Sequence, residues 1–344
     1  MKSYDCRATA IGSFPHTDVD DALALIRECL PDIPVWPQLP NVNFREGMCQ
    51  QFSEGIPGVV IDEKERRVWV DTSGDFFGGA EKFYEKYLTE DPAEFAISPE
   101  YAAGFPAFIE KMKGESERAF AVKGHVTGPV TWGLTIADEN RRATYYNEDL
   151  KDVIVKCMAR KARWQVKRLR ELNGGVIVFV DEPYLQSIGS SMVALDRGDV
   201  IEKLDEVFEE IICAGGIPGI HCCGNSDWGL VSRTKTRIIN FDAYEYGETI
   251  SLYPKEIGAY LERGGAIAWG IVPASEQAMS ETADSLIGKL FAAFAHLEKH
   301  GLKRELLLER SLITPSCGVG SHTLEVAEGV LRLTRKVSDK LRGA

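Results

Sequence analysis

Residues 176–183 read Val-Ile-Val-Phe-Val-Asp-Glu-Pro, a short apolar run rich in β-branched residues that ends in two carboxylates. Such a run is typical of a strand that is buried on both faces, as strands of parallel sheets are. Similar runs alternate along the chain with longer stretches of helical pattern. This order predicts repeated β/α units that close on a parallel sheet.

Eight such units are present. We expect strands at residues 8–13, 35–39, 120–126, 176–181, 217–222, 238–244, 266–271 and 312–315. We expect helices at residues 17–29, 98–113, 147–172, 200–214, 253–263, 275–300 and 321–341. Over 344 residues this predicts an α/β fold of the (β/α)8 TIM-barrel class, with one catalytic domain at 1–344. Residues 58–72 read as a β-hairpin with a charged turn, inserted after the second strand.

The composition is that of an ordinary globular protein, with 44% hydrophobic and 27% charged residues. There is no run of about 18 apolar residues and no signal-peptide core, so we expect a cytoplasmic protein without a membrane partner. Eight cysteines in so long a chain are too few for a disulfide scaffold. The net charge of −12 argues against nucleic acid as a partner, because a nucleic-acid binder needs a basic face.

The strongest candidate for chemistry is the segment 221–225, His-Cys-Cys-Gly-Asn, taken together with Cys317. His221 and Cys223 alternate on an extended segment, so their side chains leave the same face, whereas Cys222 points the other way. One imidazole and two thiolates are ligands that zinc binds. The sequence therefore predicts a zinc site at His221, Cys223 and Cys317. A closed structural zinc site and plain core packing are the alternatives.

Unusual residues recur at the predicted carboxyl ends of the strands. They are residues 11–15 (Ile-Gly-Ser-Phe-Pro), 128–131 (Gly-Pro-Val-Thr), 181–183 (Asp-Glu-Pro), His221 with Cys223, Glu245 and Cys317. Barrel enzymes carry their chemistry at this end of the strands. We therefore expect these segments, which are distant in sequence, to meet around one mouth.

Together these motifs resemble the catalytic barrel of cobalamin-independent methionine synthase and its relatives, the uroporphyrinogen-decarboxylase-like zinc methyltransferases. The motifs follow the family's order: residues 11–15, 127–131, 181–183, the His221-x-Cys223 pair and 315–318 (Pro-Ser-Cys-Gly). The resemblance covers essentially the whole chain, as a short form with a single barrel. The extension Gly224-Asn225 looks more like the corrinoid-dependent branch.

The resemblance implies zinc ligands at His221, Cys223, Glu245 and Cys317, with Asp242 and Glu248 as rival carboxylates. It also implies a homocysteine site, with Ile11, Gly12 and Ser13 at the substrate carboxylate and Asp181 at its amino group. Asp181 and Glu245 would then be the catalytic carboxylates. By the residues alone, Asp181 could instead cap the next helix, Ser13 could simply turn the chain, and Glu245 could be hydrogen-bonded at the barrel rim.

The chain departs from the folate-using branch of the family. Gln186-Ser187 stand where the family carries a glutamate for the pterin, and Thr135 stands where a tryptophan is expected. Residues 270–274 lack the histidine that serves as proton donor, and residues 41–44 lack a glutamate of the amino-acid site. A methyl group that leaves cobalt needs no proton. We therefore expect methylcobalamin, or a methylated corrinoid protein as a partner, to be the methyl donor.

These considerations predict a zinc-dependent methyltransferase that moves a methyl group from a methylated corrinoid to a thiol, in the first place homocysteine to give methionine. One alternative is another thiol such as coenzyme M, or a different acceptor in a demethylation pathway; a sulfonate would want a basic residue in place of Asp181. The other alternative is a decarboxylase or binding protein on the same barrel. Such decarboxylases use an arginine-rich N-terminal motif, which Arg7 alone does not supply.

Overall fold

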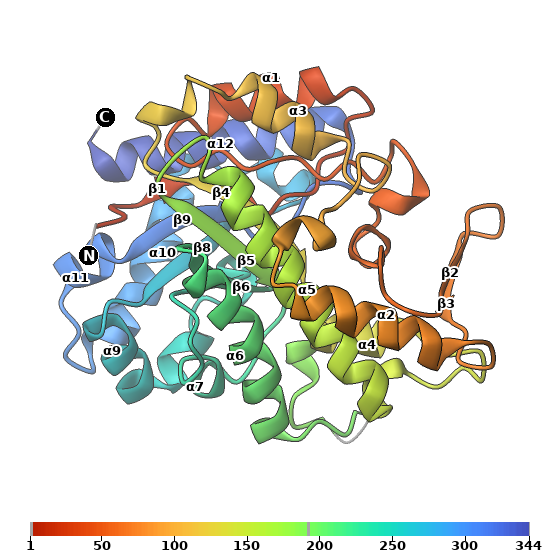
Figure 1. Ribbon diagram of the computed structural model, residues 1–344. Helices are drawn as coiled ribbons and strands as arrows, with labels where there is room; N and C mark the ends of the chain where they lie inside the picture. Colours follow the sequence, from red (N-terminus) through yellow and green to blue (C-terminus); the bar gives the residue numbers. More distant parts are fainter. Residues whose placement is uncertain (1–2, 191–192, 344) are drawn as a thin grey trace.

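The computed structural model describes residues 3–190 and 193–343. At the centre of the described chain lies a sheet of seven strands in the order β1-β9-β8-β7-β6-β5-β4, and every neighbouring pair is parallel. The sheet is curled, with helices on its outside (Figure 1). The strands are β1 (Arg7–Ala8), β4 (Val122–Thr127), β5 (Val176–Asp181), β6 (Ile217–Cys222), β7 (Ile238–Phe241), β8 (Ala266–Val272) and β9 (Ser311–Pro315).

Strand β5 shows why these segments form a parallel sheet. All of its residues are buried, as a continuous apolar run allows when both faces of the sheet are covered. Alternate residues enter two different clusters. Val178 belongs to the large core beneath the helices, whereas Ile177 and Phe179 pack with Ile238 and Leu312 of other strands. Because side chains alternate between the two faces of a strand, the single apolar run of β5 contributes to two hydrophobic clusters.

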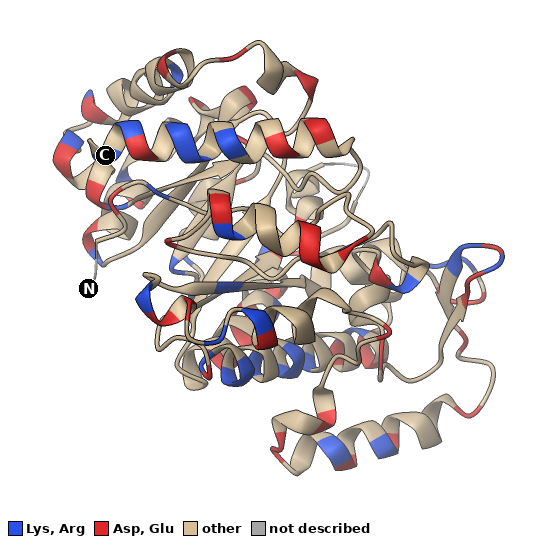
Figure 2. Cartoon of the chain, turned by 90° about the horizontal axis from the view of Figure 1, so that it is seen from above, with Lys and Arg blue, Asp and Glu red and all other residues tan. Residues whose placement is uncertain are grey.

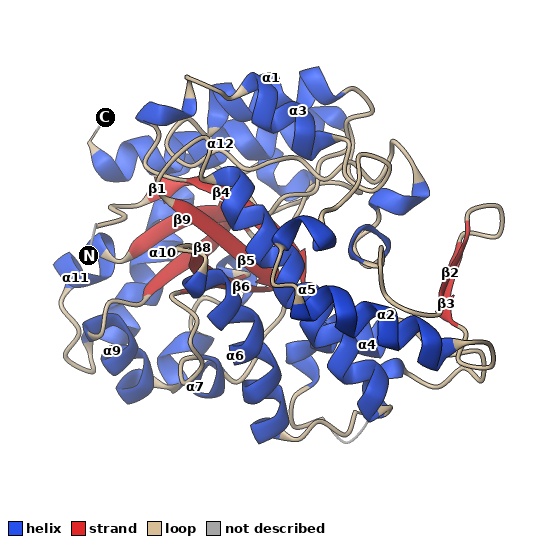
Figure 3. Cartoon of the chain, viewed as in Figure 1, coloured by secondary structure: helices blue, strands red, loops and turns tan. Residues whose placement is uncertain are grey.

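Helices surround the sheet (Figure 3). They are α1 (Val19–Cys29), α2 (Phe76–Leu88), α3 (Gly104–Lys111), α4 (Pro129–Thr135), α5 (Glu148–Leu169), α6 (Arg197–Cys213), α7 (Trp228–Val231), α8 (Ala243–Tyr246), α9 (Pro254–Glu262), α10 (Ala283–Glu298), α11 (Arg304–Glu309) and α12 (Leu324–Arg342). The last helix, α12, packs against α1, α10 and β9. Figure 2 shows charges of both signs interspersed along the helices. Among the described helices, none combines the length and the apolarity that crossing a membrane would need.

Residues 34–38 lie between the two edge strands of the sheet. Val35 forms a parallel bridge with Lys123 of β4, and Gln38 forms one with Ser13, beyond the end of β1. Prolines at positions 34, 37 and 40 have no N–H to donate to a neighbouring strand. The strand expected at 35–39 is therefore reduced to two isolated bridges.

Most elements differ from their expected bounds by a few residues, and two of the larger differences concern the first strand and a late helix. The first strand, expected at 8–13, ends at Ala8. The helix expected at 275–300 begins only at Ala283, because Thr282 and Ser285 form a capping box that starts the helix there. Both differences lie at element ends, where local capping and turns decide the boundary.

The placement of Glu245 at the end of a strand was wrong. The strand expected at 238–244 ends at Phe241. Asp242 then caps α8, because its Oδ1 accepts a hydrogen bond from Glu245 N at 3.0 Å. Glu245 therefore lies on a short helix, beyond the end of β7.

Strands β2 (Val59–Asp62) and β3 (Arg67–Val70) pair antiparallel with each other. Arg66, in the turn between them, has φ +49°. The pair stands away from the parallel sheet (Figure 1). Val70, which is buried and bridges Asp138, is one of its attachments, and the ion pair of Glu63 with Arg45 is another.

Gly128 directly follows β4 and packs closely against Glu182, and this contact can be tested by substitution. A Cβ at Gly128 would lie 2.1 Å from Glu182 Oε1. Glu182 is held in place, because its two oxygens accept hydrogen bonds from Val130 N at 3.0 Å and Thr131 N at 2.7 Å. We predict that Gly128→Ala lowers the free energy of unfolding by about 1–3 kcal/mol through overpacking, measured by urea denaturation.

Gly288→Ala is the matched control. Gly288 lies within α10, and a Cβ there meets nothing within 4 Å. Helix propensity should therefore raise the free energy of unfolding by about 0.5–1 kcal/mol. A Gly128→Ala protein as stable as the wild type would show that Glu182 is not fixed in this way.

Candidate metal centre

Three side chains meet at the carboxyl ends of β6 and β9. His221 is the penultimate residue of β6, Cys223 follows that strand directly, and Cys317 lies two residues after β9. One nitrogen of His221 and the two Sγ atoms all lie within 4.8 Å of one another. The structure thus brings together three of the predicted ligands.

The three side chains border a cavity of about 420 Å³. His221 is buried and the two cysteines are partly exposed. Ile11, Ser13 and Asp181, all predicted site residues, line the same cavity. The cluster therefore has one side that a small ligand can reach, as a catalytic metal site requires.

His221 is oriented by Asn240 on β7. Its Nδ1 lies 2.5 Å from Asn240 Oδ1, and the Asn240 amide nitrogen donates to Ala268 O and Thr314 Oγ1, both at 2.8 Å. These two bonds fix the amide, so its oxygen accepts from Nδ1 of His221 and leaves Nε2 with a free lone pair. Burial lowers the pKa of His221 to about 4, which keeps the ring neutral. A neutral ring held in this way is typical of metal-ligating histidines.

The two cysteines interact with each other. A hydrogen bond from the Cys317 thiol lowers the pKa of Cys223 to about 7, and the same bond raises the pKa of Cys317. One sulfur of the pair is thus close to the thiolate form at neutral pH. Cys222 points away from them and is fully buried, with its Sγ 3.9 Å from Pro183 O.

This set of donors fits zinc. An imidazole and two thiolates are borderline and soft donors, which zinc prefers to carboxylate-only sites. A closed structural site would need a fourth protein ligand. Within the described residues, no further His, Cys, Asp or Glu places a ligand atom within 4.8 Å of all three of these ligand atoms. A zinc ion held by these three side chains would therefore have a position left for a ligand from the cavity.

Glu245, the fourth predicted ligand, is not part of this cluster. Its side chain is exposed on α8. Of the rival carboxylates, Glu248 is exposed and lies 3.4 Å from His296. Asp242 is close enough to Cys223 to raise its pKa, but its side chain caps α8. The geometry gives no support to Glu245 as a ligand or as a catalytic group, so both roles stay predictions.

Asp181 ends β5 next to His221 and faces the cavity. Its side chain is buried, and Oδ1 has no hydrogen-bond partner among the described residues. Burial raises the pKa of Asp181, and the ammonium of Lys123 on β4 opposes that rise. Lys123 itself donates to Ile11 O at 2.7 Å. A buried carboxylate oxygen without a donor is costly, so the cavity has a place for a cation or an N–H group beside the metal centre.

The turn at residues 11–13 forms another part of the cavity wall. Gly12 has φ +151°, and a Cβ there would lie 2.6 Å from His125 Nδ1, so only glycine fits. The amides of Gly12 and Ser13 donate to no acceptor in the described structure, and Ser13 Oγ accepts from Gly320 N at 3.4 Å. Ser13 lines the cavity, so its unused amide is a suitable donor for a carboxylate there, with the amide of Gly12 next to it along the chain.

Three buried polar residues support the site: Lys123, Glu182 and Asn240. In the sequence, Glu182 was noted only as part of the motif at 181–183, and Lys123 and Asn240 were not predicted to belong to the site. A signal for two of them was present, because Lys123 and Asn240 interrupt apolar runs that predict strands buried on both faces. Glu182 connects the end of β5 to the first turn of α4. Burial raises its pKa to about 7.

Among solved structures, the chain is similar to a B12-independent methionine synthase from Shewanella sp. W3-18-1 in complex with selenomethionine, at 15% sequence identity and a TM-score of 0.46. The similarity covers 69% of this chain and 67% of that chain. No family model and no curated protein matches the chain. Because identity and TM-score are both low, the function of the site has to be inferred from its own geometry.

We predict that Cys317→Ala loses the metal, because the substitution removes one of three ligands. Metal analysis of the purified, folded variant should find below about a tenth of the zinc held by the wild type. Cys213→Ala is the control, since Cys213 is exposed and outside the cluster, and it should retain the wild-type zinc content. A wild-type protein that holds no zinc, or a Cys317→Ala protein that holds as much as the wild type, would rule out this centre.

Proposed function

We propose that this protein is a zinc-dependent methyltransferase that moves a methyl group from a methylated corrinoid to the sulfur of homocysteine, giving methionine. One observation carries the proposal. Three zinc-type ligands, His221, Cys223 and Cys317, border a cavity that also contains the unpartnered buried carboxylate of Asp181. A place for a thiol thus lies beside a place for an amine.

We also infer that the fold is a closed (β/α)8 barrel in which residues 34–38 serve as the eighth strand. Their bridges to Ser13 and Lys123 join the two edges of the seven-stranded sheet. In such barrels the catalytic groups lie at the carboxyl ends of the strands. The three ligands and Asp181 occupy those ends.

A zinc ion at this site would hold the substrate sulfur and keep it as a thiolate at neutral pH. The chain's own residues prepare the position. Asn240 keeps Nε2 of His221 unprotonated, and the hydrogen bond between Cys317 and Cys223 favours the thiolate of Cys223. The partly exposed side of the cluster leaves room for one further sulfur from the cavity.

The other polar groups of the cavity match the rest of homocysteine. Its ammonium group would satisfy the free oxygen of Asp181 by a charge-assisted hydrogen bond. Its carboxylate would accept from the unused amides of Gly12 and Ser13. An amino-acid thiol therefore satisfies three kinds of group at once, whereas a simple thiol satisfies one.

The transfer itself needs no acid from the protein. The thiolate sulfur attacks the methyl carbon in line with the carbon–cobalt bond, so a sulfur–carbon bond forms as the carbon–cobalt bond breaks. The electron pair of the broken bond stays on cobalt, which leaves as Co(I). Residues 270–274, Gly-Ile-Val-Pro-Ala, carry no side chain that could donate a proton. The donor would be free methylcobalamin or a methylated corrinoid protein that docks at the mouth of the cavity.

Coenzyme M is the rival acceptor, and the groups of the cavity disfavour it. It has no ammonium group that could satisfy Oδ1 of Asp181, and its sulfonate would bring further acceptors to that place. Purified zinc-loaded protein with methylcobalamin should therefore methylate homocysteine and leave coenzyme M unchanged, with products identified by mass spectrometry. If the protein methylates neither thiol, or coenzyme M alone, the proposed function or its acceptor is wrong.

We predict that Asp181→Asn separates the amine site from the metal centre. The variant should keep its zinc, because Asp181 is not a ligand, but its kcat/KM for homocysteine should fall about 10- to 100-fold with the loss of a charged hydrogen bond. The matched substrate is 4-mercaptobutyrate, which is homocysteine without the amino group, and its turnover should be nearly unchanged. An equal loss with both thiols would mean that Asp181 does not bind the amine.

A further inference from the structure

A second cavity, of about 440 Å³, lies at the opposite end of the sheet from the metal centre. Its lining residues sit at or just before the amino ends of the strands. Ile217, which lines it, begins β6, and His221 lies near the other end of that strand. The two sites are therefore about 13 Å apart along β6, at ~3.3 Å per residue.

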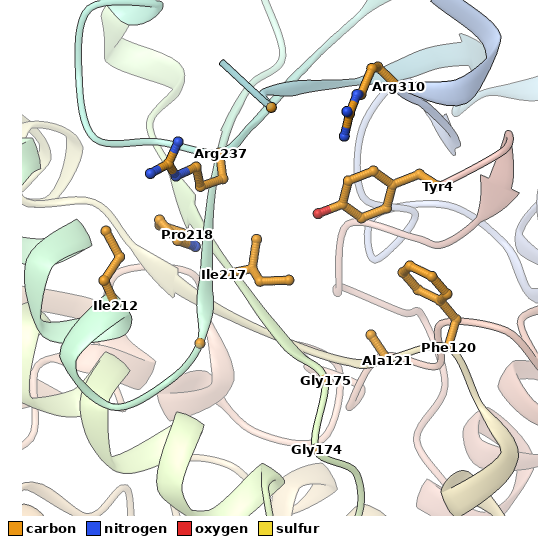
Figure 4. A pocket seen from close by; sticks show the side chains of 12 residues that line it. Tyr4, Phe120, Ala121, Gly174, Gly175, Ile212, Ile217, Pro218, Arg237 and Arg310 are labelled. Carbon is orange, nitrogen blue, oxygen red and sulfur yellow. The ribbon is translucent and has the colours of Figure 1, made fainter. Parts of the chain in front are cut away.

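The wall of this cavity is mostly apolar. Figure 4 shows the rings of Tyr4 and Phe120 on one side, Ile212 and Arg237 on the other, and Ile217 between them. No carboxylate is among the described residues that line the cavity. Its charged lining residues are both arginines, Arg237 and Arg310 (Figure 4).

Arg310 lacks partners for part of its guanidinium group. Its side chain is only 14% exposed, and its Nε and Nη1 are buried without a hydrogen-bond partner in the described structure. Nη2 lies 3.6 Å from Oε1 of Glu309, a side chain that is 45% exposed. Buried donors of a charged group are costly when they are unused. An anion in the cavity would remove that cost.

Other polar groups surround the same space. Arg310 and Arg237 both act on Tyr4, since each lowers the pKa that burial raises to about 12. Tyr260 is fully buried nearby and interacts electrostatically with Tyr4 and Arg237. Positive charge and hydroxyl donors therefore gather beside an apolar wall.

We propose that this cavity is a binding site for a small amphipathic monocarboxylate. The carboxylate would pair with the guanidinium group of Arg310, with Arg237 as a second positive charge. The apolar part would lie against Phe120 and Ile217. The volume is within the range of small-molecule sites, about 300–1,000 Å³.

The surroundings select against other classes of ligand. Two arginines without a lining carboxylate disfavour an amine. The apolar wall offers few donors for the remaining oxygens of a phosphate, and these oxygens would lose their hydration on entry. A neutral apolar molecule would leave the Arg310 donors unused. An acid with an apolar body satisfies both parts of the site.

The test uses zinc-loaded full-length protein and isothermal titration calorimetry with octanoate, octanol, octylamine and inorganic phosphate. We expect octanoate to bind at least about tenfold more tightly than the other three, since a charge-assisted hydrogen bond contributes about this much. Equal binding of octanol, or tighter binding of phosphate or octylamine, would overturn the proposal. So would the absence of octanoate binding.

Two variants assign the binding to this cavity. Arg310→Gln removes the charge, and Ile212→Glu adds a repelling carboxylate at a lining position that is 40% exposed and so tolerates the change. Each should weaken octanoate binding about 10- to 100-fold. Arg141→Gln is the control for the loss of an arginine, because Arg141 is exposed and does not line the cavity.

Cys317→Ala tests whether octanoate binds at the metal centre instead. Octanoate binding should be unchanged in this variant. If octanoate binding is lost with Cys317→Ala, or survives intact in both Arg310→Gln and Ile212→Glu, the ligand binds elsewhere and the proposal is wrong. Because calorimetry measures binding alone, these results do not depend on methyl transfer.

Discussion

The register between β5, β6 and β7 is the constraint on which the site depends. It pairs Asp181 with His221, and His221 with Asn240. Residues paired in a parallel sheet lie side by side at one level and point to the same face. Asp181, the candidate metal ligand His221 and Asn240, which orients that histidine, therefore come together without help from loops. A slip of β6 by one residue would turn His221 outward and bring Cys222 in.

The interior of the sheet changes character along the strands. Near the amino ends it is filled by apolar side chains such as Ile177 and Ile238, and farther along it becomes polar. Lys123 marks the change, because it lies 4.2 Å from the ring of Phe179 while its ammonium donates to Ile11 O. Asn240 has partners for its amide, so it serves the structure, whereas Asp181 has a free oxygen at the cavity. Unused bonding capacity thus distinguishes the group available to a substrate from the group that supports it.

Much of the fold and part of the site could be predicted from the sequence, for local reasons. Strands β5 and β6 have their predicted bounds, because each is an apolar run that ends in polar residues. His221 and Cys223 could be paired because the alternation along a strand is a local property. Glu245 was misplaced, because a helix cap at Asp242 ended the preceding strand early. The roles of Asn240 and Lys123 depend on which strands become neighbours, and the sequence pattern does not contain this information.

The cavity at the amino ends of the strands could not be predicted from the sequence, because it too depends on which segments become neighbours. Its lining residues come from several different β/α units, and none belongs to a motif. Arg310 and Arg237 look like ordinary surface arginines in the sequence. Only the tertiary arrangement of the strands places both near Tyr4 and buries the Arg310 donors. The two sites proposed at opposite ends of the same strands thus differ in preference, one for an amine and a thiol and the other for an acid.

The central claim is that His221, Cys223 and Cys317 hold one zinc ion with a position left open for a thiol. X-ray absorption at the zinc edge measures this most directly, because it counts the sulfur atoms bound to the metal. The account predicts two sulfur ligands in the zinc-loaded protein and three after homocysteine is added. A sulfur count that does not change on addition of homocysteine, with all positions already filled by the protein, would contradict it.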